Sequence, residues 1–133
     1  MREETPVIFV DMHCETTSEK IAMGRFLDGR VSAVIGTHTH VQTADERIFP
    51  GGTAFLCDAG MCGPTESCLG REIESIVSRF VTCMPQTMPI AKGPVSLHGA
   101  IIEIDELSGR ARSIQRLARE WTTPERSGNG ANP

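Results

Sequence analysis

The chain opens with two apolar runs on either side of an amphipathic stretch. The first run, Val7–Val10, is continuous and rich in β-branched residues, which predicts a strand buried on both faces of a sheet. Residues 18–27 place apolar side chains at helical spacing behind a capping box formed by Thr16 and Glu19, which predicts a helix. The second run, Val31–Ile35, predicts another buried strand. A strand, a helix and a strand in succession form a βαβ unit, whose two strands run parallel.

The remaining elements are indicated by turn residues and by periodicity. Residues 47–49 and 53–56 flank a Pro-Gly-Gly turn and predict a β-hairpin. Residues 71–84 keep apolar side chains at the spacing of one helical face, which predicts an amphipathic helix. Residues 97–105 and 110–117 predict a closing antiparallel hairpin. Together these elements predict an α/β fold.

Composition limits the size of the fold and the class of partner. A chain of 133 residues with 39% hydrophobic residues is long enough for one modest domain, which we place at residues 1–121 because no internal boundary or repeat is found. Residues 122–133 have almost no apolar side chains, which predicts a disordered tail. A net charge of -4 argues against broad electrostatic binding of nucleic acid or anionic lipid. A phosphate-bearing substrate would therefore have to be held by a metal ion or by a few placed groups.

Two further features bear on where the protein is found. No stretch reaches the roughly 18 consecutive apolar residues of a membrane span, and the first residues are polar rather than typical of a signal peptide. The five cysteines are odd in number and none forms a Cys-x-x-Cys pair, so neither a disulfide framework nor a zinc ribbon is indicated. The sequence predicts a cytoplasmic protein with reduced thiols and no membrane partner.

Three histidines stand where the two predicted parallel strands end. His13 follows the first strand, and His38 and His40 follow the second. Because the carboxyl ends of parallel strands share one edge of a sheet, all three are expected at a common site. Imidazole nitrogens suit zinc, manganese or iron. An ordinary interpretation competes with this metal site, in which the histidines are surface-loop residues that make hydrogen bonds, and spacing alone does not decide between the two.

Nearby carboxylates add little to this pattern. Three neutral imidazoles leave a divalent cation without charge compensation, and the local acidic candidates are Asp11, Glu15 and Asp58. We interpret all three structurally. Asp11 bonds loop amides or orients a histidine, Glu15 sits beside a helix start, and Asp58 sits in a turn.

A different class of function would use sulfur ligands. In this alternative, His13, His38, His40 and one cysteine hold a structural zinc ion, which would make the chain a small structural zinc-binding or regulatory module without catalysis. Cys57, Cys62 and Cys68 are also candidates to bind a metal ion together with His13 or His98. Their irregular spacing favours buried structural thiols instead.

Longer motifs surround the histidines. Residues 10–20 and 28–48 closely resemble the C-terminal part of the YmdB-like calcineurin-type metallophosphoesterases. Residues 50–54 and 58–64 extend the match, so that it covers most of the chain from Val7 to about Asp105. A motif of this length is far more specific than a bare pair of histidines.

The resemblance implies an enzyme that cuts phosphodiesters or phosphomonoesters of small molecules, with cyclic nucleotides as a candidate substrate class. It implies a dinuclear site of iron or manganese, with zinc as an alternative. His13, His38 and His40 match histidine ligands of the family, the first two on one metal ion and the third on the other. The implied fold is the C-terminal half of a calcineurin-like α/β/β/α sandwich.

The resemblance also implies that part of the site lies elsewhere. The N-terminal half of the family supplies acidic ligands and a proton-donating histidine that have no counterpart in this sequence. Two metal ions need negative ligands to lie close together, so we expect little or no activity from this chain alone. A complementary polypeptide carrying the N-terminal half, or a homo-oligomer, is expected to complete the fold.

Overall fold

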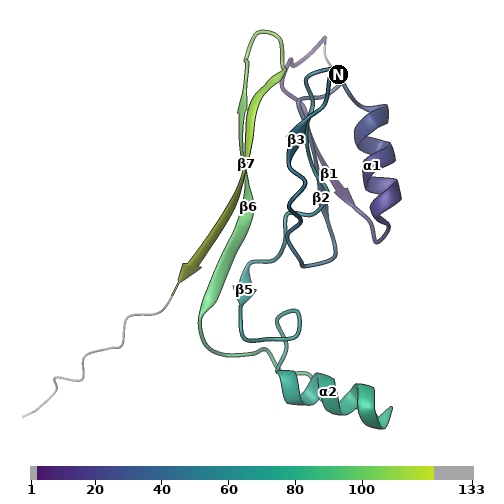
Figure 1. The fold of residues 1–133 in the computed structure, drawn as a ribbon, viewed down its shortest axis with the longest axis vertical. Coiled ribbons are helices and arrows are strands. Elements are labelled where there is room, and N and C mark those ends of the chain that lie inside the picture. Colours follow the sequence, from purple (N-terminus) through teal and green to yellow (C-terminus); the bar gives the residue numbers. More distant parts are fainter. Residues whose placement is uncertain (1–2, 122–133) are drawn as a thin grey trace, which may run out of the picture. The chain divides into compact units, whose positions relative to one another are not determined.

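The computed structural model describes residues 3–121, so the predicted tail at 122–133 lies outside the described residues. The strands are β1 (Phe9–His13), β2 (Ala33–Thr37), β3 (Arg47–Ile48), β4 (Ala54–Leu56), β5 (Gly63–Pro64), β6 (Val95–Ile104) and β7 (Ala111–Trp121), and the helices are α1 (Thr17–Phe26) and α2 (Ile73–Thr82). One sheet has the strand order β1-β2-β4-β3 and the other β5-β6-β7. The chain therefore has a mixed α/β fold with two sheets (Figure 1).

The predicted βαβ unit is confirmed. β1 and β2 pair in parallel, with His13 opposite Thr37, and α1 connects them. β4 continues the sheet in parallel beside β2, and β3 pairs antiparallel with β4, which confirms the predicted first hairpin. Because β1 and β2 run in the same direction, the residues that follow them leave the sheet at one edge.

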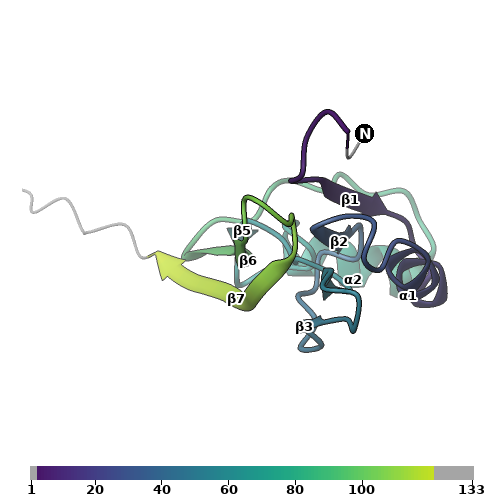
Figure 2. The same ribbon diagram turned by 90° about the horizontal axis from the view of Figure 1, so that it is seen from above.

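The core of the first sheet lies between its central strands and α1. Val34 and Phe55 are fully buried. Phe55 stacks on Phe49 with ring centroids 5.0 Å apart. On α1, a Cβ at Gly24 would lie only 2.6 Å from the Phe55 ring, so glycine allows the helix to lie directly against these rings. Figure 2 shows α1 alongside the strands of this sheet.

Two details of this unit differ from the prediction. β1 is not buried on both faces, since Phe9 is 58% exposed. The reason is that only the face carrying Val10 and Met12 packs against the core, whereas Phe9, Asp11 and His13 lie on the other, exposed face. Thr16 is the N-cap residue of α1, but its side chain makes no capping hydrogen bond, so the predicted capping box is wrong.

β6 and β7 form the predicted closing hairpin. They are neighbours in the second sheet, and both are longer than the sequence predicts. The Asp105 carboxylate holds the turn between them by accepting hydrogen bonds from the amides of Leu107 and Ser108. Gly109 has a φ of 68°, the left-handed conformation that glycine adopts without strain.

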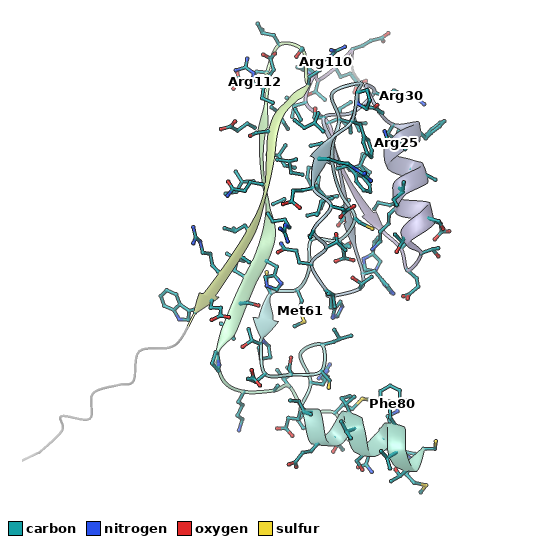
Figure 3. All side chains as sticks on the ribbon, viewed as in Figure 1. Arg25, Arg30, Met61, Phe80, Arg110 and Arg112 are labelled. Carbon is teal, nitrogen blue, oxygen red and sulfur yellow. The ribbon has the colours of Figure 1, made fainter. Side chains whose placement is uncertain are left out.

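The described chain divides into two compact units. One comprises residues 3–62 and 97–119, and the other comprises 63–96 and 120–121. α2 belongs to the second unit and confirms the predicted amphipathic helix, but none of its residues is buried. Phe80 projects from it with 80% of its surface exposed (Figure 3). Neither helix within residues 3–121 is long and apolar enough to cross a membrane.

Candidate metal centre

His13 and His38 meet at the carboxyl ends of β1 and β2. His13 is the last residue of β1, and His38 directly follows β2. The Nε2 atom of His13 lies 3.1 Å from the Nδ1 atom of His38. The ring centroids are 4.9 Å apart and the ring planes are inclined by 83°. The two nitrogens that face each other are thus within hydrogen-bond distance.

The other nitrogen of each ring has a polar partner of its own. The Nδ1 atom of His13 lies 3.0 Å from the Thr37 hydroxyl, which donates to Asp11 Oδ1 at 2.7 Å. Since the hydroxyl hydrogen goes to Asp11, the hydroxyl oxygen accepts from His13 Nδ1, and the lone pair of His13 is on Nε2. The Nε2 atom of His38 lies 2.5 Å from Glu15 Oε2. Both rings are thus oriented by a carboxylate, directly or through one hydroxyl.

These partners refine what the sequence predicts for the local carboxylates. Asp11 does orient a histidine, through Thr37. Glu15 lies just before α1, as predicted, and also reaches His38, although 81% of its side chain is exposed. The role of Thr37 is not predicted from the sequence, where its only signal is its place at the end of a buried strand, opposite His13.

His40 is not part of the hydrogen-bonded pair formed by His13 and His38. It is exposed, has a φ of 66°, and makes no hydrogen bond with His13 or His38 in the part of the chain that the structure describes. The structure therefore brings together two of the three predicted ligands. Among residues 3–121, no three or more His, Cys, Asp and Glu side chains form a group arranged to hold a metal ion.

A buried ion pair lies behind the histidine loop, which we define as residues 37–40. Lys20 Nζ lies 2.8 Å from Asp58 Oδ2, and each side chain is 1% exposed. Asp58 also accepts hydrogen bonds from the amides of Thr39 and Gly60, each at 2.9 Å. Burial by itself would raise the pKa of Asp58, but the bonds from Lys20 and the two amides outweigh it and lower the pKa below its ordinary value. Asp58 is therefore an anion whose oxygens are occupied by protein donors.

The role of Lys20 is likewise not predicted from the sequence. Lys20 and Gly24 are the two buried residues of α1 and lie one turn apart on the same face. A charged residue on the core-facing side of a helix needs a buried partner, which is a signal that the sequence does contain. Only the structure identifies that partner as Asp58, 38 positions along the chain.

Gln42 ties the segment after the histidine loop to the closing hairpin. Its Nε2 atom lies 3.0 Å from the carbonyl oxygen of Gly99, 3.1 Å from that of Leu117 and 3.3 Å from that of Ala59. Two amide hydrogens thus serve three carbonyl oxygens that come from separate parts of the chain. The side chain fixes where the chain runs after His40.

Within residues 3–121, the cysteines belong to no group of three or more His, Cys, Asp and Glu side chains arranged to hold a metal ion. All five are free, in agreement with the predicted reduced thiols. Cys57 is buried, and burial raises the pKa of its thiol, which keeps it protonated at neutral pH. Cys62 is exposed, contrary to the prediction of a buried thiol, and donates to the carbonyl oxygen of His98. His98 itself lies half-buried in β6.

Comparison with known proteins identifies the family. The sequence model described as YmdB-like protein matches residues 1–117. The chain belongs to the YmdB-like family. It is 50% identical over 115 residues to a protein of Bacillus subtilis (strain 168) named 2′,3′-cyclic-nucleotide 2′-phosphodiesterase. That match covers 86% of this chain and 44% of the relative.

Two solved structures share the fold of this YmdB-like chain. A hypothetical protein from Thermus thermophilus is 40% identical with a TM-score of 0.81, over 86% of this chain and 45% of that one. A protein from Mycoplasma pneumoniae described as a novel phosphatase is 35% identical with a TM-score of 0.83, over 90% of this chain and 43% of that one. The chain thus spans less than half the length of each of these three relatives.

Proposed function

We propose that this YmdB-like chain supplies the histidine ligands of a dinuclear metal site in a phosphodiesterase. The observation that carries the proposal is the pair of facing nitrogens, His13 Nε2 and His38 Nδ1, 3.1 Å apart. A metal ion binds an imidazole nitrogen at about 2.0–2.1 Å, so two nitrogens on one ion lie no more than about 4.2 Å apart. The observed distance fits one ion shared by both rings.

The hydrogen bonds made by the other nitrogen of each ring, His13 Nδ1 and His38 Nε2, also fit metal binding. Metal-bound histidines commonly donate their other ring N–H to a carboxylate or to another oxygen, which fixes the tautomer and the ring orientation. His13 does so through Thr37 to Asp11, and His38 faces Glu15. A bound metal ion would take the place of the hydrogen that the two facing nitrogens share, and His38, donating from Nε2 to Glu15, would then direct its Nδ1 lone pair toward the ion. Both lone pairs are then directed at the same place.

His40 is proposed as the histidine ligand of the second ion. Its exposed position, and the absence of a hydrogen bond to His13 or His38 within residues 3–121, are compatible with that role. Iron or manganese is the proposed metal, with zinc as an alternative. When bound, two ions supply Lewis-acid stabilisation of the phosphoryl oxygens and of the attacking water. His13, His38 and His40 are uncharged donors, so the acidic ligands must come from other polypeptide segments.

The proposed substrates are cyclic nucleotides, because the 50%-identical relative is named as a phosphodiesterase of 2′,3′-cyclic nucleotides. Hydrolysis of such a ring adds one water molecule. The water oxygen joins phosphorus, the bond from phosphorus to one ribose oxygen breaks, and that oxygen takes up a proton. The product is a nucleoside phosphomonoester, and no oxidant or reductant is needed.

The open edge of β1 is the proposed docking place for the rest of the enzyme. Within residues 3–121, no strand pairs with the outer side of β1. Unpaired strand edges readily accept another strand. Beside β1 lies an apolar cavity of about 630 Å³, lined by Ile8, Phe9, Val10, Leu27, Gly29, Arg30 and Val31. A polypeptide bound there would complete the α/β/β/α sandwich of which residues 1–121 form one part.

Reconstitution tests the proposal. The chain would be co-produced with the part of the Bacillus subtilis relative that it does not cover, purified as a complex and assayed for bound metal and for hydrolysis of a 2′,3′-cyclic nucleotide. We expect about two metal ions per complex, measurable hydrolysis, and loss of both in H38A. H98A is the matched control, because His98 lies in β6 and makes no hydrogen bond with His13, His38 or His40 within residues 3–121. Retained turnover in H38A would refute the assignment of His38 as a metal ligand. A complex that binds no metal and shows no hydrolysis would refute the proposed function.

X-ray absorption on the metal-loaded complex separates this function from the structural zinc module. Nitrogen and oxygen neighbours alone support the hydrolase. A sulfur shell supports the module and overturns the proposal, since the proposed ligands contain no sulfur.

A further inference from the structure

The histidine loop is strained. His38 has a φ of 113° and His40 a φ of 66°, and both values lie in a region that residues with side chains rarely adopt. Such residues persist only where the surrounding structure over-determines them. Something other than the local sequence must therefore hold residues 37–40 in place.

The only residue between these two histidines is bonded to a buried carboxylate. The amide of Thr39 donates to Asp58 Oδ2 at 2.9 Å. The same oxygen accepts from Lys20 Nζ at 2.8 Å, and the other oxygen accepts from the amide of Gly60 at 2.9 Å. With 1% of each side chain exposed, the Lys20 and Asp58 charges are held out of water. This carboxylate is the point at which α1, the histidine loop and the segment after β4 are joined.

The space behind the loop is shaped for the lysine. Gly36 lies at the end of β2, and a Cβ there would come 2.8 Å from Lys20 Cδ and 1.7 Å from the carbonyl oxygen of Cys57. A larger residue at this position would push away either the lysine stem or the backbone that leads into Asp58. The glycine lets both approach β2 closely.

We propose that the buried Lys20–Asp58 ion pair is the positioning element of the metal centre. Through the Thr39 amide it holds His38 against His13 and sets the direction of His40. A buried ion pair is by itself weak evidence for stability, because the cost of removing both charges from water offsets their attraction. Its bond to the strained loop gives the pair a role in the site. The inference rests on the proposed metal function, to which it adds two residues that touch no metal.

The direct test is Asp58→Asn, measured against Asp28→Asn as a matched control. Asp28 also binds backbone amides, those of Gly51 at 2.9 Å and Thr53 at 3.4 Å, and has no bond to the histidine loop. Cobalt(II) is the probe, because its visible spectrum reports the ligands while a titration gives the affinity. We expect D58N to weaken cobalt binding by about 10-fold or more, the scale of losses at outer-shell partners. D28N should leave the affinity within about two-fold of the original chain while lowering the melting temperature.

Unchanged cobalt affinity in D58N overturns the proposal. So does an equal loss in D58N and D28N, because the effect would then follow general stability. Ring nitrogen chemical shifts of His13 and His38, measured by NMR without metal, report the loop directly and should move in D58N but not in D28N. If the complex reconstituted with the remaining part of the enzyme binds no cobalt while these shifts still move, the metal function fails and the positioning role stands.

Hydrogen exchange keeps the proposal testable should D58N fail to fold. In the original chain without metal, the Thr39 amide should exchange as slowly as that of Phe55 in β4, because its acceptor is buried. The Val41 amide, which bonds only the Thr39 hydroxyl at 3.3 Å, should exchange quickly. Rapid exchange at Thr39 would overturn the proposal.

Discussion

Replacing Thr37 by valine tests how the metal centre orients His13. Thr37→Val keeps the shape of the side chain but removes the hydrogen bond from His13 Nδ1 at 3.0 Å and the one to Asp11 at 2.7 Å. Loss of such a partner typically weakens metal binding by about 10–100-fold, or about 1.4–2.7 kcal/mol. The free energy of unfolding should fall by no more than about 1 kcal/mol, because His13 and Asp11 are exposed and water replaces the lost bonds.

Cobalt titration and urea unfolding of the same samples measure the two effects separately. Thr65→Val is the matched control, because the Thr65 hydroxyl donates to the Pro94 carbonyl at 3.2 Å in the second unit. Thr37→Ser restores the hydroxyl and should restore the affinity. If T37V binds cobalt as tightly as the original chain, the path from Asp11 to His13 does not orient a ligand. A loss of affinity that matches a large loss of stability would also refute the reasoning.

Three further predictions concern the fold. Gly24→Ala should lower the free energy of unfolding, because the new Cβ would lie 2.6 Å from the buried Phe55 ring. Such overpacking costs about 1–3 kcal/mol, which outweighs the gain of about 1 kcal/mol in helix propensity. Greater stability of the variant in urea would contradict this prediction. Phe80→Ser should change that free energy by less than about 0.5 kcal/mol, because the ring is 80% exposed, and a larger loss would mean that another molecule covers it. Hydrogen bonds from Ser108 and from the Arg112 guanidinium hold the pKa of Asp105 well below its ordinary value. The contribution of the ionised Asp105 to stability is therefore complete above about pH 4, and it is lost as the pH falls toward the folded-state pKa. In Asp105→Asn, the melting temperature should therefore fall less between about pH 5 and pH 2 than it does in the original chain. If the two chains show the same dependence of melting temperature on pH, the Asp105 carboxylate does not stabilise the fold in this way.

Local patterns predict the first sheet well, because its strands, helix and turns are specified by residues that are close together in the sequence. The β-branched run at Val31–Ile35 is a buried strand, and the Pro-Gly-Gly turn does join β3 to β4. The βαβ order fixes the direction of β1 and β2, which places His13 and His38 at one edge. Local patterns do not correctly predict which side chains of β1 and α2 are buried. Phe9 and Phe80 are apolar and periodic, yet both are exposed, because burial depends on what packs against a strand or helix.

The sequence by itself determined that histidines leave neighbouring parallel strands, and through its long motifs it determined the family. Only the tertiary structure decided which ring nitrogens face each other, that Asp11 acts through Thr37, and that Lys20 is buried against Asp58. The physical reason is distance along the chain. Periodicity and turn chemistry report contacts between near neighbours, whereas each of these bonds joins residues more than 20 positions apart, and such pairs are chosen by the packing of the whole unit.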